Sequence, residues 1–168
     1  NFWVTTTEPE ILIPVGHEIA SEQFRLPIEP LAIAEHQASG KTTVSTNGDE
    51  VKVSSPRMQF VFNKKSGLVT SYKVNGTEYF AEGFGIQPNF WRAPNDTDYG
   101  NGQPKREQIW KQSSKNFNVA DVITESDGNK TVLTANYLLA AGNLYIVKYT
   151  IFPGGVVHAD ITFTSTDM

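Results

Sequence analysis

Four runs of alternating apolar and polar residues follow one another in the last third of the chain, each separated from the next by a turn signal. Asp127-Gly128-Asn129, Gly142-Asn143 and Pro153-Gly154-Gly155 supply those turns. A period of two is typical of β-strands, and short glycine-containing connections favour antiparallel neighbours. The sequence therefore predicts a meander of long strands, in one large sheet that faces a second sheet, over residues 117–125, 130–139, 144–152 and 156–164.

The middle of the chain carries the same pattern. Met58, Phe60 and Phe62 share one predicted strand face, and Leu68, Thr70, Tyr72 and Val74 share a face of the next strand. Asn75-Gly76 favours a type I′ hairpin turn, because both residues tolerate positive φ. The only helix predicted is a short one over 104–111, with Pro104 in its first position. These features predict an all-β, antiparallel sandwich.

The start of the chain is organised differently. Strand-like runs cover 2–7, 10–15 and 18–26, and residues 28–50 are rich in Pro, Ala, Ser, Gly and Thr. We interpret 1–27 as the terminal strands of an upstream β domain, 28–50 as a linker and 51–168 as the sandwich. Because the chain begins as if midway along a strand, we expect it to be a fragment of a longer protein.

Composition narrows the classes of function. A net charge of −4 with no basic stripe argues against nucleic-acid binding, and no apolar run reaches the about 18 residues of a membrane span. The absence of cysteine excludes disulfides, thiol nucleophiles and Cys-ligated zinc. The three histidines are widely separated and share no metal-ligand spacing. These properties fit the cytoplasm and the periplasm equally.

One segment, residues 88–102, departs from the rhythm of strands and turns. It gathers aromatic rings, a guanidinium, two carboxylates and amides, a mixture that suits a carbohydrate. Asp96 and Asp98, at an extended spacing of about 6.6 Å, are compatible with a glycosidase pair, but carboxylates between Pro and Gly more often cap turns, and we favour that structural role. Arg92 is expected to pair with Asp96 or Asp98, and Phe90 and Trp91 to anchor the loop rather than to serve as sugar platforms.

Residues 89–102 closely resemble the NFWRAPTDNDRGNG-type signature of large, multidomain β-galactosidases of glycoside hydrolase family 2. Two further segments resemble the same family in the right order. Residues 16–24 are similar to the closing strand of the immunoglobulin-like domain after the catalytic barrel, and 62–68 with 73–76 to the opening hairpin of the last domain. In this chain Asn95 and Thr97 stand where Thr and Asn are more usual.

The resemblance implies a galactose mutarotase-like supersandwich as the last domain of a retaining β-galactosidase. The catalytic glutamates of the family lie on an upstream barrel, so no catalytic residue is expected here and the chain alone is expected to be inactive. The barrel is expected to bind Mg²⁺ and a monovalent cation, and the parent to be a homo-oligomer; no cofactor or metal is expected in this chain. The residues expected at the rim of the sugar site are Arg92, Asn95, Asp96, Asp98, Tyr99, Gly100 and Asn101.

Two other interpretations remain open. Aromatic-rich β-sandwiches are often free-standing carbohydrate-binding modules, and a signal peptide and stop codon of its own would favour that alternative, whereas an upstream barrel in the same reading frame would favour the β-galactosidase segment. A family-2 enzyme of another specificity, such as a glucuronidase or mannosidase, is disfavoured because those relatives usually lack this last domain. The preferred hypothesis assigns the chain a non-catalytic role, in which it supports the barrel and lends a loop to the sugar site.

Overall fold

The computed structural model describes residues 1–25, 40–81 and 84–165, and divides the chain into two units, Asn1–Glu35 and His36–Met168. Most of the predicted linker, residues 28–39, lies outside the described residues. Within the described ranges, no helix is long and apolar enough to cross a membrane.

The first unit is a hairpin of two antiparallel strands, β1 (Phe2–Thr5) and β2 (Glu18–Glu22). The strand predicted over 10–15 is wrong: this run is a turn closed by a single bridge between Glu10 and Ile13. The physical reason is Pro14, which lacks the N–H that a strand ladder needs at that position.

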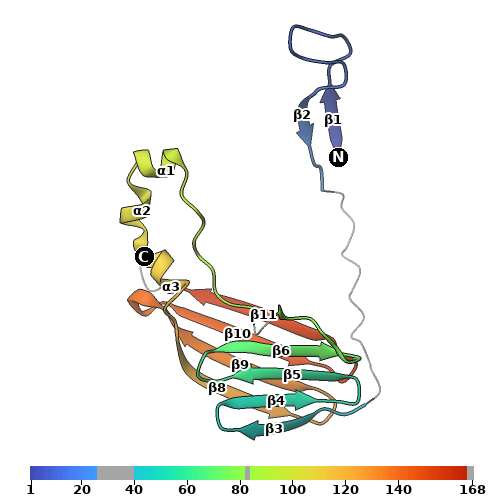
Figure 1. The fold of residues 1–168 in the computed structure, drawn as a ribbon, viewed down its shortest axis with the longest axis vertical. Coiled ribbons are helices and arrows are strands. Elements are labelled where there is room, and N and C mark those ends of the chain that lie inside the picture. The colour runs from blue at the N-terminus through green and yellow to red at the C-terminus, as the bar shows by residue number, and fades with distance from the viewer. Residues whose placement is uncertain (26–39, 82–83, 166–168) are drawn as a thin grey trace. The chain divides into compact units, whose positions relative to one another are not determined.

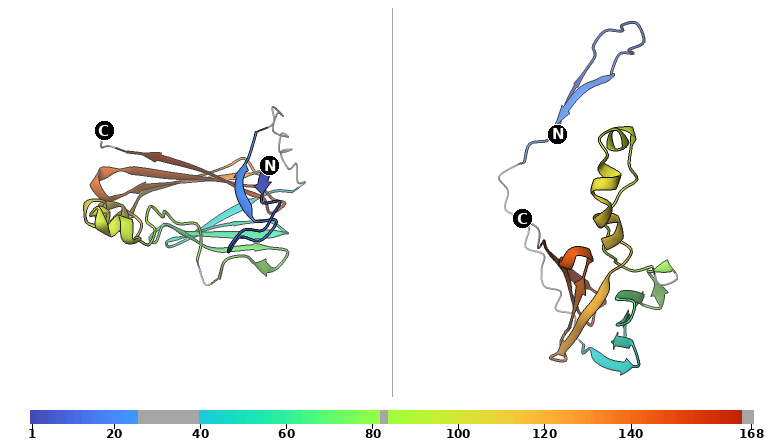
Figure 2. Two further views of the ribbon diagram at one scale, coloured as in Figure 1. Left: turned by 90° about the horizontal axis from the view of Figure 1, so that it is seen from above. Right: turned by 90° about the vertical axis from the view of Figure 1, so that its left-hand side faces the viewer.

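The second unit is built on two antiparallel sheets, which lie one above the other in Figure 2 (left) and face on in Figure 1. One sheet has the order β3-β4-β5-β6-β7 and the other β11-β10-β9-β8, so both are meanders of sequential strands. The prediction of an all-β antiparallel sandwich is confirmed. The strands are β3 (Thr43–Asn47), β4 (Glu50–Ser54), β5 (Met58–Asn63), β6 (Leu68–Val74), β7 (Thr77–Glu78), β8 (Asn118–Ser126), β9 (Thr131–Leu138), β10 (Leu144–Ile151) and β11 (Val157–Thr164).

Strand β3 lies inside the range predicted as linker. Val44 pairs with Val53 and Asn47 with Glu50 across the two-residue turn through Gly48, where φ is +57°. All five residues of β3 are exposed, as expected for an edge strand. Because most of these residues are polar, the sequence shows no apolar alternation that would have predicted this strand. The five-stranded sheet therefore begins at residue 43.

The core fills the space between the two sheets. Its fully buried side chains include Phe60 and Phe62 from one sheet and Tyr149 from the other, with ring centroids 5.4 Å (Phe60–Tyr149) and 6.2 Å (Phe62–Tyr149) apart. The alternation predicted along β9 and β10 is confirmed, because Leu133, Ala135, Tyr137, Tyr145, Val147, Tyr149 and Ile151 are all buried. Burial of these apolar surfaces is the main force that holds the sheets together.

A β-bulge reverses the predicted faces at the start of β6. Phe60 pairs with Tyr72 but Phe62 pairs with Val69, so Thr70 is an extra residue on that strand. Because one inserted residue moves the following side chains to the other face, Val69 is buried in the core in place of the predicted Leu68 and Thr70. Tyr72 packs against the core as predicted.

The inward face of β11 is also less covered than the alternation predicts. Ile161 is 52% and Phe163 40% exposed, whereas Val157 and Ala159 pack against the core. Phe163 packs instead against the rings of Phe90 and Trp110, with centroids 5.3 Å and 5.8 Å away.

Three short helices connect the two sheets and replace the single helix predicted over 104–111. They are α1 (Asp96–Gly100), α2 (Gln103–Arg106) and α3 (Gln108–Ser113), which form a column at one end of the sandwich in Figure 1. Gly102, at φ +74°, separates the first two, and Glu107 departs from helical geometry between the last two. A 3₁₀ turn, η2 (Ala140–Gly142), lies against α3.

Candidate functional site

The signature segment begins at an aromatic anchor. The ring of Phe90 lies 5.3 Å from Phe163, 5.9 Å from Tyr145 and 6.0 Å from Trp110, measured between ring centroids. The backbone N–H of Phe90 donates to Ser114 Oγ at 2.7 Å, and that hydroxyl donates to the Trp110 carbonyl at 3.0 Å. Phe90 therefore ties the segment both to the sandwich and to α3.

The next two side chains leave this cluster. Trp91 is half-buried, and Lys111 Nζ lies 5.9 Å from its ring centroid, within the range of a cation–π contact. The side chain of Arg92 is exposed to solvent. Its Nη1 donates to the Ala93 carbonyl at 3.1 Å.

Arg92 and Asp98 form a bidentate ion pair, with Nη1–Oδ2 at 2.6 Å and Nη2–Oδ1 at 2.9 Å. Of the two carboxylates expected as partners of Arg92, the structure selects Asp98. This two-pronged geometry gives directional as well as electrostatic stabilisation. The pair joins Arg92 to Asp98, six positions further along the chain and inside α1, and so fixes the intervening segment that contains Pro94.

Asn95 and Asp98 also form a capping box at the start of α1. Asn95 Oδ1 accepts from the Asp98 N–H at 3.0 Å, and Asp98 Oδ2 accepts from the Asn95 N–H at 2.8 Å. These bonds satisfy two backbone donors that a helix start otherwise leaves unpaired. The ion pair with Arg92 and the Asn95 N–H hold the pKa of the Asp98 carboxyl below its usual range, so Asp98 is a fixed anion. We call Arg92, Asn95 and Asp98 the loop lock.

The geometry of α1 and of the loop lock bears on whether Asp96 and Asp98 could act together as a glycosidase pair. Both lie on α1, where residues two apart project about 200° from each other, so the extended spacing considered from the sequence does not apply. Asp98 is only 8% exposed and its oxygens are taken up by the lock, while Asp96 is exposed. The two carboxylates do not converge on one substrate, which agrees with the structural role favoured from the sequence.

The remaining predicted rim residues lie at the end of α1. Tyr99 is 65% exposed, and neither it nor Asp96 uses its side chain in a hydrogen bond or ion pair with the described residues. Gly100 ends the helix, and Asn101 caps it while its Oδ1 accepts from the Gln103 N–H at 2.9 Å. The structure thus brings the predicted residues together on α1 and the segment before it. The loop lock holds this segment in place, and the side chains of Asp96 and Tyr99 are exposed to solvent.

Ser114, Tyr145 and Phe163 hold the segment in place but were not predicted from the sequence. Ser114 is 24 residues from Phe90, and no local spacing signals a contact over that separation. The capping box does have a signal, since Asn95-x-x-Asp98 is the polar pair that marks helix starts.

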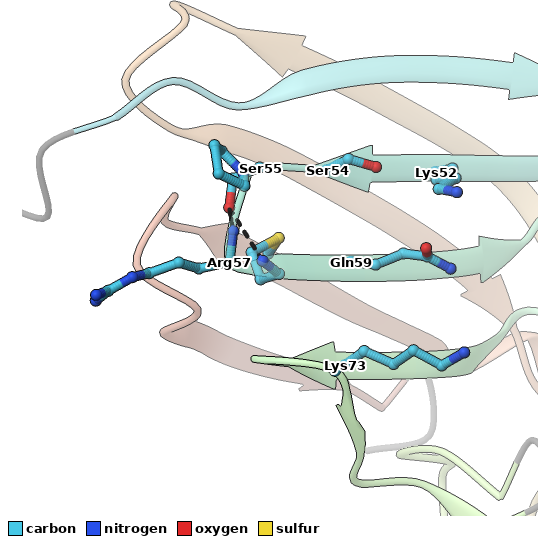
Figure 3. Close-up of a pocket in the computed structure, with 9 residues that line it drawn as sticks. Lys52, Ser54, Ser55, Arg57, Gln59 and Lys73 are labelled. Atoms are coloured by element: carbon cyan, nitrogen blue, oxygen red, sulfur yellow. Dashed lines mark hydrogen bonds between the residues drawn. The ribbon is translucent and has the colours of Figure 1, made fainter.

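A hollow of about 370 Å³ lies on the outer face of β4, β5 and β6 (Figure 3). Lys52, Arg57 and Lys73 line it together with Gln59, and no aromatic ring or carboxylate of the described part of the chain does. Ser55 Oγ, at its edge, accepts from the N–H groups of Arg57 and Met58 and so serves the turn. This hollow lacks the ring platform that suits a sugar.

Within residues 1–25, 40–81 and 84–165, no three His, Asp or Glu side chains lie together in a way that could hold a metal ion. His158 and Asp160 are an exposed pair, with Nε2 and Oδ1 3.9 Å apart.

Comparison with known proteins identifies the family. Residues 54–168 match the sequence family described as β-galactosidase small chain. The chain is 32% identical over 142 residues to a β-galactosidase of Priestia megaterium, 28% over 151 residues to a β-galactosidase of Kluyveromyces lactis, and 29% over 162 residues to β-galactosidase 2 of Enterobacter cloacae. These alignments cover 83%, 84% and 88% of this chain but only 13%, 14% and 16% of the relatives. The chain therefore belongs to the β-galactosidase small-chain family.

Proposed function

We propose that this chain is a non-catalytic part of a β-galactosidase that hydrolyses terminal β-D-galactosides, such as lactose, with retention of configuration. Its relatives are named β-galactosidases, and the chain spans about one seventh of their length. A retaining enzyme needs two carboxyls about 5–5.5 Å apart, and the signature segment offers no such pair. The catalytic glutamates are then supplied by an upstream barrel of the parent polypeptide.

The loop lock is the observation that carries the proposed role of the segment. Arg92, Asn95 and Asp98 fix the backbone and leave Asp96 and Tyr99 exposed on one short helix. A tyrosine ring packs well on the apolar face of a sugar, and a carboxylate accepts hydrogen bonds from sugar hydroxyls. We place this helix at the rim of the parent's sugar site, where it shapes binding without taking part in bond cleavage.

The rest of the proposal concerns the parent. The sandwich supports the barrel, the barrel holds Mg²⁺ and a monovalent cation, and the parent assembles as a homo-oligomer. Each of these remains a prediction from the family resemblance, and none requires a metal ligand from the residues described here.

Kinetics of the full-length parent test the rim role. Removal of a ring contact worth about 0.5–1.5 kcal/mol in Tyr99→Ala raises KM for lactose about 2- to 10-fold, with kcat changed less, and Tyr99→Phe retains most of the affinity. Tyr79 is exposed to a similar degree, 62%, and Tyr79→Ala is the matched control with unchanged kinetics. Identical KM values in the Tyr99→Ala parent and the unaltered parent would contradict the rim placement.

Titration of the isolated chain separates this role from that of a free-standing binding module. Intrinsic tryptophan fluorescence includes the signal of Trp91 in the signature segment, over a background from Trp3 and Trp110. No saturable change with galactose or lactose below about 10 mM, equivalent to about −2.7 kcal/mol, is expected for a rim that needs its barrel. Saturation at sub-millimolar sugar would instead support the binding-module alternative.

A further inference from the structure

A groove of about 530 Å³ runs behind the signature segment, between residues 84–89, Trp91 and the end of α3. The loop lock does not extend into it, and the rim role of Asp96 and Tyr99 makes no use of it. Its size is within the range of specific binding sites.

The walls of the groove are fixed by contacts to the sandwich. Gly85 is buried against β6 so closely that a side-chain carbon there would overlap the carbonyl oxygen of Val69. On the other side, Ser114 Oγ links Phe90 to the Trp110 carbonyl and so joins the segment to α3. Because these walls are already ordered, a ligand that binds in the groove loses little free energy to ordering of the protein.

The lining combines exposed apolar side chains with positive charge. Phe84 is 73% and Ile86 40% exposed, and Trp91 adds a second ring. Lys111 and Lys115 stand at the groove, and none of the described residues that line it is Asp or Glu. Neutral sugars have no charge to match two ammonium groups. The complementary ligand presents an apolar side chain next to a carboxylate, which is the chemistry of a polypeptide segment.

We propose that this groove docks a segment of the parent polypeptide from outside residues 1–168, one that carries an apolar side chain beside Asp or Glu. This inference rests on the proposed function and names the surface through which the sandwich meets the rest of the enzyme. The relatives are about seven times longer than the aligned region, so most of a parent of that length lies outside this chain. Because Trp91 belongs both to the groove and to the signature segment, the docked segment supports the loop from behind.

Hydroxyl-radical footprinting of the full-length parent and of the isolated chain tests the proposal. Labelling of Phe84 and Trp91 is expected to fall several-fold in the parent, with or without galactose. Labelling of Tyr99 is expected to fall only when galactose is added, which reports separately on the proposed function. Equal labelling of Phe84 and Trp91 in the two proteins would overturn the docking proposal even if Tyr99 responds to sugar.

Charge reversal identifies the partner's chemistry. Lys111→Glu with Lys115→Glu is expected to restore labelling of Phe84 and Trp91 in the parent. Lys105→Glu with Lys148→Glu, which reverses two exposed lysines outside the groove, is the matched control and retains protection. Protection that disappears on dilution would assign the groove to a second copy, and protection that requires galactose would make it a sugar subsite. Either result would refute docking of the parent's own segment.

Discussion

Replacement of Gly85 by alanine tests whether the backbone before the signature segment is held against the sandwich as described. The added methyl carbon would overlap the Val69 carbonyl oxygen and lie 3.0 Å from the Val69 carbonyl carbon and 3.1 Å from its Cβ. These obstacles include the backbone of β6, which cannot rotate away as a flexible side chain can. Overpacking of this kind costs about 1–3 kcal/mol, so we take a loss of about 2 kcal/mol in the free energy of unfolding.

Urea unfolding of the isolated chain, followed by circular dichroism, measures the loss. With a denaturant dependence of about 1–3 kcal/mol per molar urea, the midpoint for Gly85→Ala falls by about 1 M. Gly100 is the matched control, because it lies within α1 without positive φ and a methyl group there meets nothing within 4 Å. Gly100→Ala should leave the midpoint unchanged or raise it slightly, since alanine favours helix. Equal midpoints for Gly85→Ala and the unaltered chain would refute the close packing of this segment on β6.

Two further predictions concern the core and the lock. Tyr137 OH donates to the Gly67 carbonyl at 2.7 Å, whereas Tyr149 OH is buried and has no hydrogen-bond partner among the described residues. Tyr137→Phe is therefore expected to destabilise the chain by about 1–2 kcal/mol, and Tyr149→Phe to be neutral or stabilising; equal losses in thermal unfolding would contradict this assignment. Because the folded pKa of Asp98 is depressed, by Arg92 first and the backbone second, its stabilisation of α1 is present above the unfolded pKa of about 3.9 and is lost as the pH falls through the lower folded pKa. Carboxyl-detected NMR should give a lower pKa for Asp98 in the unaltered chain than in the Arg92→Ala variant. Coincident titration curves would exclude the ion pair as the cause of the lowered pKa.

The sandwich was predictable because its strands alternate strongly and its turns carry glycine. Every second residue from Tyr145 to Ile151 faces the core, as the period of two requires. Asn75 and Gly76 both have the positive φ that their turn signal implies. The faces of β6 were not predictable, because the extra residue at Thr70 has no signature of its own. β3 escaped prediction for a different reason: an exposed edge strand carries little apolar pattern.

The signature segment was predictable in composition but not in geometry. Its aromatic anchor and the pairing of Arg92 with a carboxylate were expected, and the structure shows both. Arg92 pairs with Asp98 and not with Asp96 because a helix starts at Asn95 and its capping box holds the Asp98 carboxylate. The sequence indicated an irregular loop there and did not predict this helix. Contacts such as Phe90 with Ser114 and Phe163 join distant parts of the chain, and only the folded sandwich brings them together.

The central claim, that this chain shapes a sugar site without supplying a catalytic group, is tested most directly by steady-state kinetics of the full-length parent carrying Asp98→Asn. The substitution keeps the size of the side chain and removes the charge that holds Arg92. Misplacement of the loop predicts a fall in kcat/KM of no more than about 100-fold, with Arg92→Ala giving a similar loss. A fall of about 10⁴-fold or more in kcat, the scale of losing a reacting group, would make Asp98 a catalytic carboxylate and contradict the account.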